Sequence, residues 1–265
     1  MEKLYALYRR WASSDETKGD GIVVGSDLTQ EWLLVWWWDH YQRFNTYPVT
    51  FVDFGMSEGM KQWCRERGSF VSLPVADIFV AEKLEINPLL IQQWENTYGC
   101  WFWSSRNAWF KKPLACLQSP YKRSIWIDLD CEIRGPLKDL FELCETGSGM
   151  ALAKEDNDFP SKQTGYNAGV IVFKRGISLI ETWADFSFES NDAFYGDQDV
   201  LCKIIHDQQI PITELPPIYN WSRRQTENPQ AVILHWHGPH GKSHIYHQVM
   251  SSNLDGLYFE SCSEQ

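Results

Sequence analysis

The chain has 265 residues, a formal net charge of −11 and a sequence pI near 5.1, so we expect neither nucleic acid nor an anionic membrane surface as a partner. Hydrophobic residues make up 43% of the chain and charged residues 22%, which is ordinary for a folded soluble protein. Aromatic residues reach 15%, with 14 Trp, and such side chains can stack on sugars or fill a core.

The seven cysteines are scattered and include no Cys-X-X-Cys pair, which favours reduced thiols and a cytoplasmic location. The longest apolar run, from Trp32 to Trp38, is too short for a transmembrane helix, and the N-terminus lacks the apolar core of a signal peptide. We therefore expect a soluble protein without a transmembrane segment.

The first part of the chain alternates apolar strands with amphipathic helices. Predicted strands at 21–25, 49–54 and 69–73 alternate with predicted helices at 30–44 and 57–67. This alternation is typical of a parallel sheet with helices on both faces. In the first helix, Trp32, Val35 and Trp36 share a stripe and are expected to pack in the core.

The rest of the chain continues the α/β pattern after an irregular, aromatic-rich segment at 75–103, which we expect to lie over the sheet edge. The other predicted segments are a helix at 105–117 with a break or kink near Lys112 caused by Pro113, a strand at 123–135, a helix at 136–144, strands at 150–153, 168–173 and 231–234, helices at 177–188 and 198–205, and a loop at 156–166. Without a repeat or a linker, the chain is predicted to form one domain.

Two acids in the predicted strand 123–135 stand two positions apart. Asp128 and Asp130 should therefore point to the same face, about 6.6 Å apart, where they can converge on a divalent cation. Taken alone, the pattern fits equally well with two acids that end a core strand and face water. Ligands bind beyond the carboxyl ends of parallel strands, and Asp27 follows the first strand and His235 the last. These residues are expected to share one crevice.

Three more segments carry polar side chains next to apolar strands. Residues 232–244 contain four histidines and one lysine in a Gly-rich tail, groups that can bind a metal ion or a phosphate. Tyr166-Asn-Ala-Gly169 and Tyr195-Gly-Asp-Gln-Asp199 offer amides and carboxylates, which suit a polyhydroxylated substrate. Asn167 as a turn residue and Asp197 as a helix N-cap are the plainer interpretations.

In this order the segments resemble the retaining glycosyltransferases of family 8. The similar segments are Phe110-Lys-Lys-Pro-Leu114 with 124–130 and 136–141, Tyr166-Asn-Ala-Gly169, Gly196-Asp-Gln198, Leu215-Pro-Pro-Ile-Tyr-Asn220, and His235-Trp-His-Gly238 with Lys242. An Asp-X-Asp motif alone is weak evidence, whereas five segments in family order are strong. The resemblance covers most of residues 20–245.

The resemblance implies a single GT-A domain over residues 1–265. Its sheet would be mainly parallel, with helices on both faces and a small antiparallel piece. A nucleotide-binding half at 20–145 would be followed by a donor-sugar and acceptor half at 146–245 and a C-terminal tail at 246–265. The implied activity is metal-dependent, retaining transfer of a hexose from a UDP-sugar to a carbohydrate or glycoconjugate acceptor.

The resemblance also implies roles for individual residues. Mn²⁺ or Mg²⁺ would be held by Asp128, Asp130 and His235. The nucleotide would contact Asp27, Asp128, Gly238 and Lys242. The donor sugar would lie among Lys112, Asn167, Asp197 and Gln198. Apart from the resemblance, the aromatic surplus makes Trp101, Trp103, Trp109 and Trp221 candidates for stacking on the acceptor, although burial in a core is the plainer interpretation of each one.

The chain departs from the family at two places, and other functions stay open. Lys242 is followed by Ser-His rather than Pro-Trp, and the two acids that usually follow the first strand are replaced by Gly25-Ser-Asp27. The alternatives are a nucleotide-sugar-binding protein that has lost turnover, a haloacid-dehalogenase-type phosphatase, and a zinc site at His235, His237, His240 and His244. The sequence leaves open whether His235 or His237 holds the metal, and it gives no oligomeric state.

Overall fold

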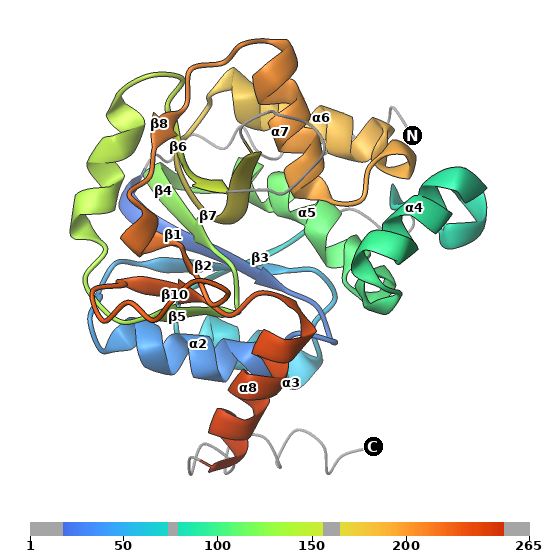
Figure 1. The fold of residues 1–265 in the computed structure, drawn as a ribbon. Coiled ribbons are helices and arrows are strands. Elements are labelled where there is room, and N and C mark those ends of the chain that lie inside the picture. Colours follow the sequence, from blue (N-terminus) through green and yellow to red (C-terminus); the bar gives the residue numbers. More distant parts are fainter. Residues whose placement is uncertain (1–17, 74–78, 156–164, 252–265) are drawn as a thin grey trace.

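The structure is a computed structural model that describes residues 18–73, 79–155 and 165–251. Its main sheet has seven strands in the order β3-β2-β1-β4-β7-β6-β8 (Figure 1). The strands are β1 (Lys18–Ser26), β2 (Val49–Asp53), β3 (Ser69–Ser72), β4 (Tyr121–Ile127), β6 (Met150–Glu155), β7 (Gly165–Lys174) and β8 (Thr213–Glu214). Strands β3, β2, β1 and β4 pair in parallel, and β7 runs antiparallel to both β4 and β6. The predicted, mainly parallel α/β sheet is confirmed.

Helices cover both faces of this sheet, as the alternating pattern predicted (Figure 1). Ile22 and Val24 of β1 pack on one side with α2, and Val23 packs on the other with α5, α6 and α7. Three consecutive buried residues are expected where a parallel strand is covered on both faces. Trp36 is buried in the first of these cores, so its predicted packing role is confirmed. The α-helices are α2 (Trp32–Gln42), α3 (Glu58–Arg65), α4 (Pro88–Tyr98), α5 (Arg106–Leu117), α6 (Ser178–Glu189), α7 (Asp197–Asp207) and α8 (Gly238–Ser251).

A smaller sheet of β5 (Cys131–Ile133), β10 (Ile233–His235) and β9 (Trp221–Ser222) lies below the main one in Figure 1. Strand β10 pairs antiparallel with β5 and parallel with β9. This is the small antiparallel piece that the resemblance implied. It places His235 beside Cys131, directly after the Asp128–Asp130 segment.

The predicted strand at 123–135 is wrong. Strand β4 ends at Ile127, residues 128–130 form a turn, and β5 begins at Cys131. The Cys131 amide donates to the Asp128 carbonyl across this turn, over 3.1 Å, as the chain passes from the main sheet to the smaller one. Strand alternation therefore does not apply to Asp128 and Asp130.

Four other segments differ from the prediction. Helix α5 continues through Pro113 without a break, because buried side chains on both sides of the proline hold the helix against the core. Residues 88–98 form α4, which Asn87 caps by accepting a bond from the Leu89 amide. The predicted helix at 136–144 is the 3₁₀ helix η4 (Lys138–Glu145). The Gly-rich tail expected as a turn starts helix α8. The remaining 3₁₀ helices are η2 (Lys83–Glu85), η3 (Trp101–Ser104), η5 (Asn191–Ala193) and η6 (Pro217–Tyr219).

Most of the predicted loop at 156–166 lies outside the described residues, and β7 already begins at Gly165. Within 18–73, 79–155 and 165–251, no helix has both the length and the apolar character needed to cross a membrane.

Candidate active site

Three segments that are far apart in the sequence meet at one edge of the sheets. The Asp128 amide donates to the Gly169 carbonyl over 2.8 Å, and the Trp236 amide donates to the Asp130 carbonyl over 2.8 Å. The acidic turn is therefore fixed to β7 on one side and to the end of β10 on the other. A glycine is needed at position 169 because a Cβ there would lie only 2.2 Å from Cε1 of His235.

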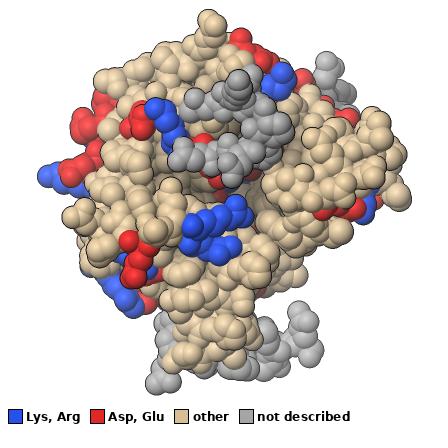
Figure 2. Space-filling view, in the orientation of Figure 1, with Lys and Arg blue, Asp and Glu red and all other residues tan. Residues whose placement is uncertain are grey.

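Two adjoining hollows lie at this edge. The smaller, of about 80 Å³, is lined by Gly25, Ser26 and Asp27 at the end of β1, and the larger, of about 230 Å³, by residues of β7, α7 and the β10–α8 connection. Trp109, Lys112, Asp128, Asp130 and Lys242 line both. In Figure 2, acidic side chains lie inside the hollowed part of this face, and basic side chains lie beside it.

Every residue that the sequence predicted for catalysis, nucleotide binding or metal binding lines at least one of these hollows. They are Asp27, Lys112, Asp128, Asp130, Asn167, Asp197, Gln198, His235, Gly238 and Lys242. The expectation of a shared crevice therefore agrees with the geometry, whereas the role of each residue stays a prediction.

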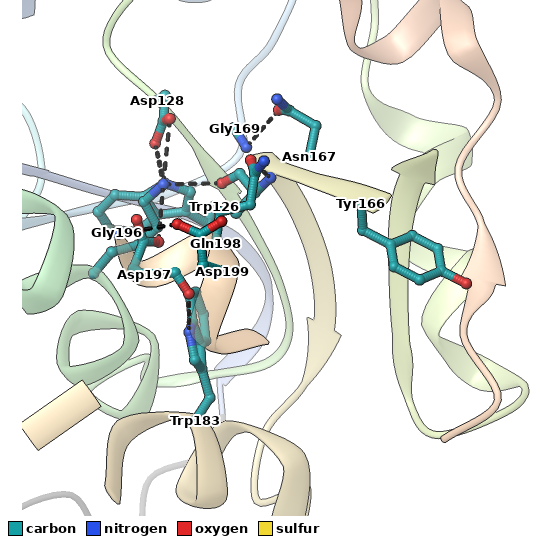
Figure 3. A network of polar contacts seen from close by, with 12 residues as sticks. Trp126, Asp128, Tyr166, Asn167, Gly169, Trp183, Gly196, Asp197, Gln198 and Asp199 are labelled. Carbon is teal, nitrogen blue, oxygen red and sulfur yellow. Dashed lines mark hydrogen bonds and ion pairs between the residues drawn. The ribbon is translucent and has the colours of Figure 1, made fainter. Parts of the chain in front are cut away.

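Lys112 is the buried cation at the centre of the site. Its Nζ lies 3.1 Å from Asp128 Oδ1 and 3.3 Å from Asp197 Oδ2, and it donates to the Ala168 carbonyl over 3.0 Å. In Figure 3, Asp128 and Asp197 lie on different sides of one network of polar contacts. Burial alone lowers the pKa of Lys112, but the two carboxylates outweigh it and raise that pKa. The amino group therefore stays charged and holds both acids.

Asp128 has a second partner, because the indole Nε1 of Trp126 donates to its Oδ1 over 2.7 Å. Its carboxylate is thus directed toward Lys112 and Trp126.

Asp130 and His235 form the second pair of the site. Both are buried, and Nε2 of His235 lies 3.3 Å from Oδ1 of Asp130. Although burial alone raises the pKa of Asp130, the imidazole beside it holds that pKa below its usual range. Burial alone lowers the pKa of His235, but Asp130 outweighs it and raises that pKa.

Asn220 orients the His235 ring, since its Oδ1 lies 3.0 Å from Nδ1 of His235. Nδ1 must carry a proton to donate to this oxygen, which leaves Nε2 as the atom that faces Asp130. The Asn220 amide in turn donates to Asn167 Oδ1 over 2.8 Å, and the Gly169 amide donates to the same oxygen over 2.8 Å. A metal-binding histidine commonly has such a second partner.

His237 has a different environment. Its Nε2 lies 2.7 Å from the Ser222 hydroxyl, and burial together with the neighbouring imidazole and arginines lowers its pKa to about 3. Among the described residues, the group of potential ligand atoms within 4.8 Å of one another consists of Asp130, Cys131 and His235. Burial raises the pKa of the Cys131 thiol well above its usual value, so that thiol stays protonated.

The proposed four-histidine zinc site does not form in the described part of the chain, where the group includes neither His240 nor His244. The His244 ring instead stacks on Trp236, with centroids 3.9 Å apart. The geometry therefore favours His235 over His237 as the histidine beside the acidic turn.

Gln198 is held in a defined position by main chain and side chain. Its Oε1 accepts from the Ala168 amide over 3.0 Å, and its amide donates to Glu155 Oε2 over 2.7 Å. Glu155 lines the larger hollow but was missed by the sequence interpretation. Its position at the end of β6, on an apolar strand that points to the same edge, was the available signal.

Two buried acids of α7 have shifted pKa values. Burial raises the pKa of Asp197 to about 6, although Lys112 opposes the shift. Burial also raises the pKa of Asp199 to about 6, although its bond from the Gly196 amide, 3.0 Å long, opposes it. Gly196, not Asp197, is the N-cap of α7, so the plainer interpretation of Asp197 is wrong. Asp199 lines the hollow and was quoted in the motif without a role.

Asp27 takes part in the turn before α2. Its Oδ1 accepts from the Thr29 amide and hydroxyl and from the Gln30 amide, over 2.8–3.0 Å. It also lines the smaller hollow, so its predicted place at the nucleotide stays a prediction.

The predicted aromatic residues divide into two sets. Trp101 and Trp109 line the larger hollow, with ring centroids 5.9 Å apart in an edge-to-face arrangement. Trp103 instead packs in the α4 cluster and donates to Glu95 over 2.7 Å, and Trp221 donates to the Thr226 carbonyl. Tyr98 and Tyr195 extend the aromatic wall, with stacked rings 4.0 Å apart.

The sequence matches no protein-family model and no curated protein. Solved structures with a similar fold include the glycosyltransferase GlyE from Streptococcus pneumoniae TIGR4, with a TM-score of 0.56 and 16% identity over 84% of this chain. The chain spans 55% of the length of GlyE. The galactosyltransferase LgtC, in complex with donor and acceptor sugar analogs, has a TM-score of 0.52 and 13% identity over 83% of this chain and 87% of its own. The chain therefore has the GT-A fold, and the fold implied by the motif resemblance is confirmed. The two solved structures that share it here are glycosyltransferases.

Proposed function

We propose that this chain is a metal-dependent, retaining glycosyltransferase that moves a hexose from a UDP-sugar to a carbohydrate or glycoconjugate acceptor. The observation that carries the proposal is the Asp130–His235 pair, with 3.3 Å between Oδ1 and Nε2, on the wall of a hollow in a GT-A fold. The fold supports the class of enzyme, and the side chains of the hollow support the chemistry.

The Asp130–His235 pair fits a divalent cation such as Mn²⁺ or Mg²⁺. With Nδ1 donating to Asn220, two electron-pair donors face each other, and they need a proton or a metal ion between them. Two ligand atoms about 2.1 Å from one ion and at right angles to it lie about 3 Å apart, close to the observed separation. Asp128, two residues earlier in the turn, is the third predicted ligand.

When bound, the metal would supply positive charge at the diphosphate, where negative charge develops as the anomeric bond breaks. The chain's own residues orient the donor. Lys112 fixes the carboxylates of Asp128 and Asp197, and Glu155 and the Ala168 amide fix Gln198. These groups can hydrogen-bond the hydroxyls of a hexose and stabilise its positive charge in the transition state.

The residue pattern favours transfer on one face of the sugar. Gln198 carries a neutral amide, which is a poor nucleophile, so a covalent intermediate on that side chain is disfavoured. The departing diphosphate and the arriving hydroxyl would then use the same side, with retention of configuration. The aromatic wall of Trp101, Tyr98 and Tyr195 can receive the apolar face of an acceptor sugar.

Calorimetry with UDP tests the proposal. We expect UDP to bind with Mn²⁺ and to lose most of its affinity with a chelator, and Asp130→Asn to abolish the metal dependence. The matched control is Asp207→Asn on the exposed end of α7, which should bind as the wild type does. Equal UDP binding with and without metal contradicts the proposal.

The proposed transfer reaction is tested by analysing the product that forms. UDP-glucose or UDP-galactose is incubated with a panel of oligosaccharides, and the anomeric proton of any product is examined by NMR. An α-linked product agrees with retention, whereas a β-linked product contradicts it. Tight metal-dependent UDP binding without transfer or donor hydrolysis would favour the alternative, a binding protein that has lost turnover.

A further inference from the structure

Three basic side chains lie at the edge of the larger hollow, and we call Arg223, Arg224 and Lys242 the basic rim. Arg224 and Lys242 line the hollow. Nη2 of Arg223 lies 3.8 Å from the position that a Cβ on Gly238 would take, and Gly238 also lines the hollow. Figure 2 shows basic side chains gathered beside the hollowed part of the face. The sequence interpretation assigned no role to either arginine.

Arg223 is held by bonds to the main chain of His235 and His237, and the Arg224 main chain is bonded to Ser222 of β9. The Arg223 amide donates to the His235 carbonyl over 3.1 Å, and its Nε donates to the His237 carbonyl over 2.7 Å. The Arg224 amide donates to the Ser222 hydroxyl over 3.2 Å. The segment after β9 thus brings Arg223 against the strand that carries His235, and Arg224 lines the same hollow as the Asp130–His235 pair.

The two basic side chains Lys112 and His235 inside the hollow lie beside carboxylates, unlike the basic side chains of the rim. Lys112 is neutralised by Asp128 and Asp197, and His235 faces Asp130. In the part of the chain that the structure describes, no carboxylate forms an ion pair with a residue of the basic rim. The two neighbouring guanidinium groups repel each other, so an anion bound between them would relieve that repulsion.

We propose that Arg223 and Arg224, together with Lys242, bind the diphosphate of the nucleotide donor. The inference rests on the proposed function and adds two residues to it. A diphosphate entering this chain of net charge −11 meets the carboxylates of the hollow, so it needs cations that are not already neutralised. Guanidinium groups match phosphate oxygens in a two-pronged geometry that lysine lacks. The rim would thereby compensate for the altered sequence that follows Lys242.

The test measures binding of UDP, uridine and inorganic pyrophosphate by calorimetry, each with Mn²⁺, to the whole chain and to Arg223→Gln and Arg224→Gln. We expect each substitution to weaken UDP and pyrophosphate binding about tenfold to a hundredfold, as for the loss of hydrogen bonds to a charged group. Uridine binding should change less than about twofold. The control is Arg43→Gln, on the exposed end of α2, which should leave all three ligands unaffected.

The Arg223 side chain also bonds to the main chain of His237, so Arg223→Gln can weaken the local structure as well as ligand binding. Arg224→Gln provides a test that does not remove this bond. Thermal unfolding of each variant, and restoration of affinity by Arg224→Lys, separate charge from structure. Both glutamine variants binding UDP and pyrophosphate within twofold of the wild type would overturn the inference while leaving the proposed function intact. Arginine-dependent pyrophosphate binding without UDP binding would support the basic rim and reject the proposed donor.

Discussion

Replacing Lys112 with methionine removes the buried cation that lies between the carboxylates of Asp128 and Asp197. The side chain of Lys112 is 6% exposed, that of Asp197 5% and that of Asp128 25%. Removing one partner of a buried ion pair costs about 3–5 kcal/mol, because the other charge stays buried without compensation. The partly exposed Asp128 carboxylate can be hydrated after Lys112 is removed, so most of the lost stability comes from the buried Asp197 carboxylate.

The size of the effect should depend on pH. The pKa of Asp197 is about 6 when Lys112 is present, and its ordinary value is 3.8, so the folded state binds this proton more tightly than the unfolded state. Without Lys112 the pKa rises further. Stability then falls, relative to the wild type, as pH rises above 6, because the variant must either bury an unpaired charge or keep a proton that the unfolded chain releases.

We therefore expect Lys112→Met to lose about 1 kcal/mol at pH 5 and about 3 kcal/mol at pH 8, from urea unfolding with unchanged m-values. The double variant Lys112→Met/Asp197→Asn should recover most of the loss at pH 8. The control is Lys61→Met on α3, where surface pairs with Asp53 and Glu58 are worth about 1 kcal/mol or less at either pH. Equal losses at pH 5 and pH 8, or a double variant no more stable than the single one, would refute the reasoning.

Three further outcomes follow from the site. Because the folded pKa of Asp197 is about 6, its contribution to the unfolding free energy should fall by about 3 kcal/mol as pH rises from about 4 to 6. The Asp197→Asn variant should lack this fall when the unfolding free energy is measured by urea titration at each pH. The prediction is wrong if the wild type and the variant show the same dependence on pH. His235→Ala should weaken Mn²⁺ binding at least about tenfold, and His237→Ala should weaken it less than about threefold. Electron paramagnetic resonance measures the bound and free Mn²⁺, and the reverse order of the two effects contradicts the assignment of His235. Trp101→Ala, which removes a ring 36% exposed at the hollow, should raise the acceptor KM about tenfold while donor hydrolysis is unchanged, and an unchanged KM rejects the stacking role.

The fold could be predicted because its signals are local. The apolar run Ile22-Val-Val24 indicates a strand that is buried on both faces. Ser57 indicates the start of α3, because its hydroxyl caps the helix by accepting from the Met60 amide. Helix α4 was missed although Asn87-Pro88 is a start signal, because its aromatic residues obscured the periodicity.

The site was predictable as a set of residues but not in its contacts. Chain order and strand ends brought the ten predicted residues to one edge. The pairing of Asp128 with Lys112, and of His235 with Asn220, depends on contacts between distant segments. Local periodicity carries no information on such contacts, and the strand that it predicted through Asp128 and Asp130 is interrupted there by a turn. The division into halves at residue 145 stays a prediction.

The turn at 128–130 explains how two acids so close in sequence can act differently. If β4 had continued, Asp128 and Asp130 would face the same side and repel each other, and either could bind the same cation. The turn instead directs Asp128 to a buried lysine and Asp130 to a histidine. Asp128, the third predicted metal ligand, is paired with Lys112, whereas Asp130 lies beside the imidazole of His235. In the proposed function, the Asp130–His235 pair and the arginines after β9 would meet the diphosphate of a donor, and the residues around Lys112 would hold its sugar.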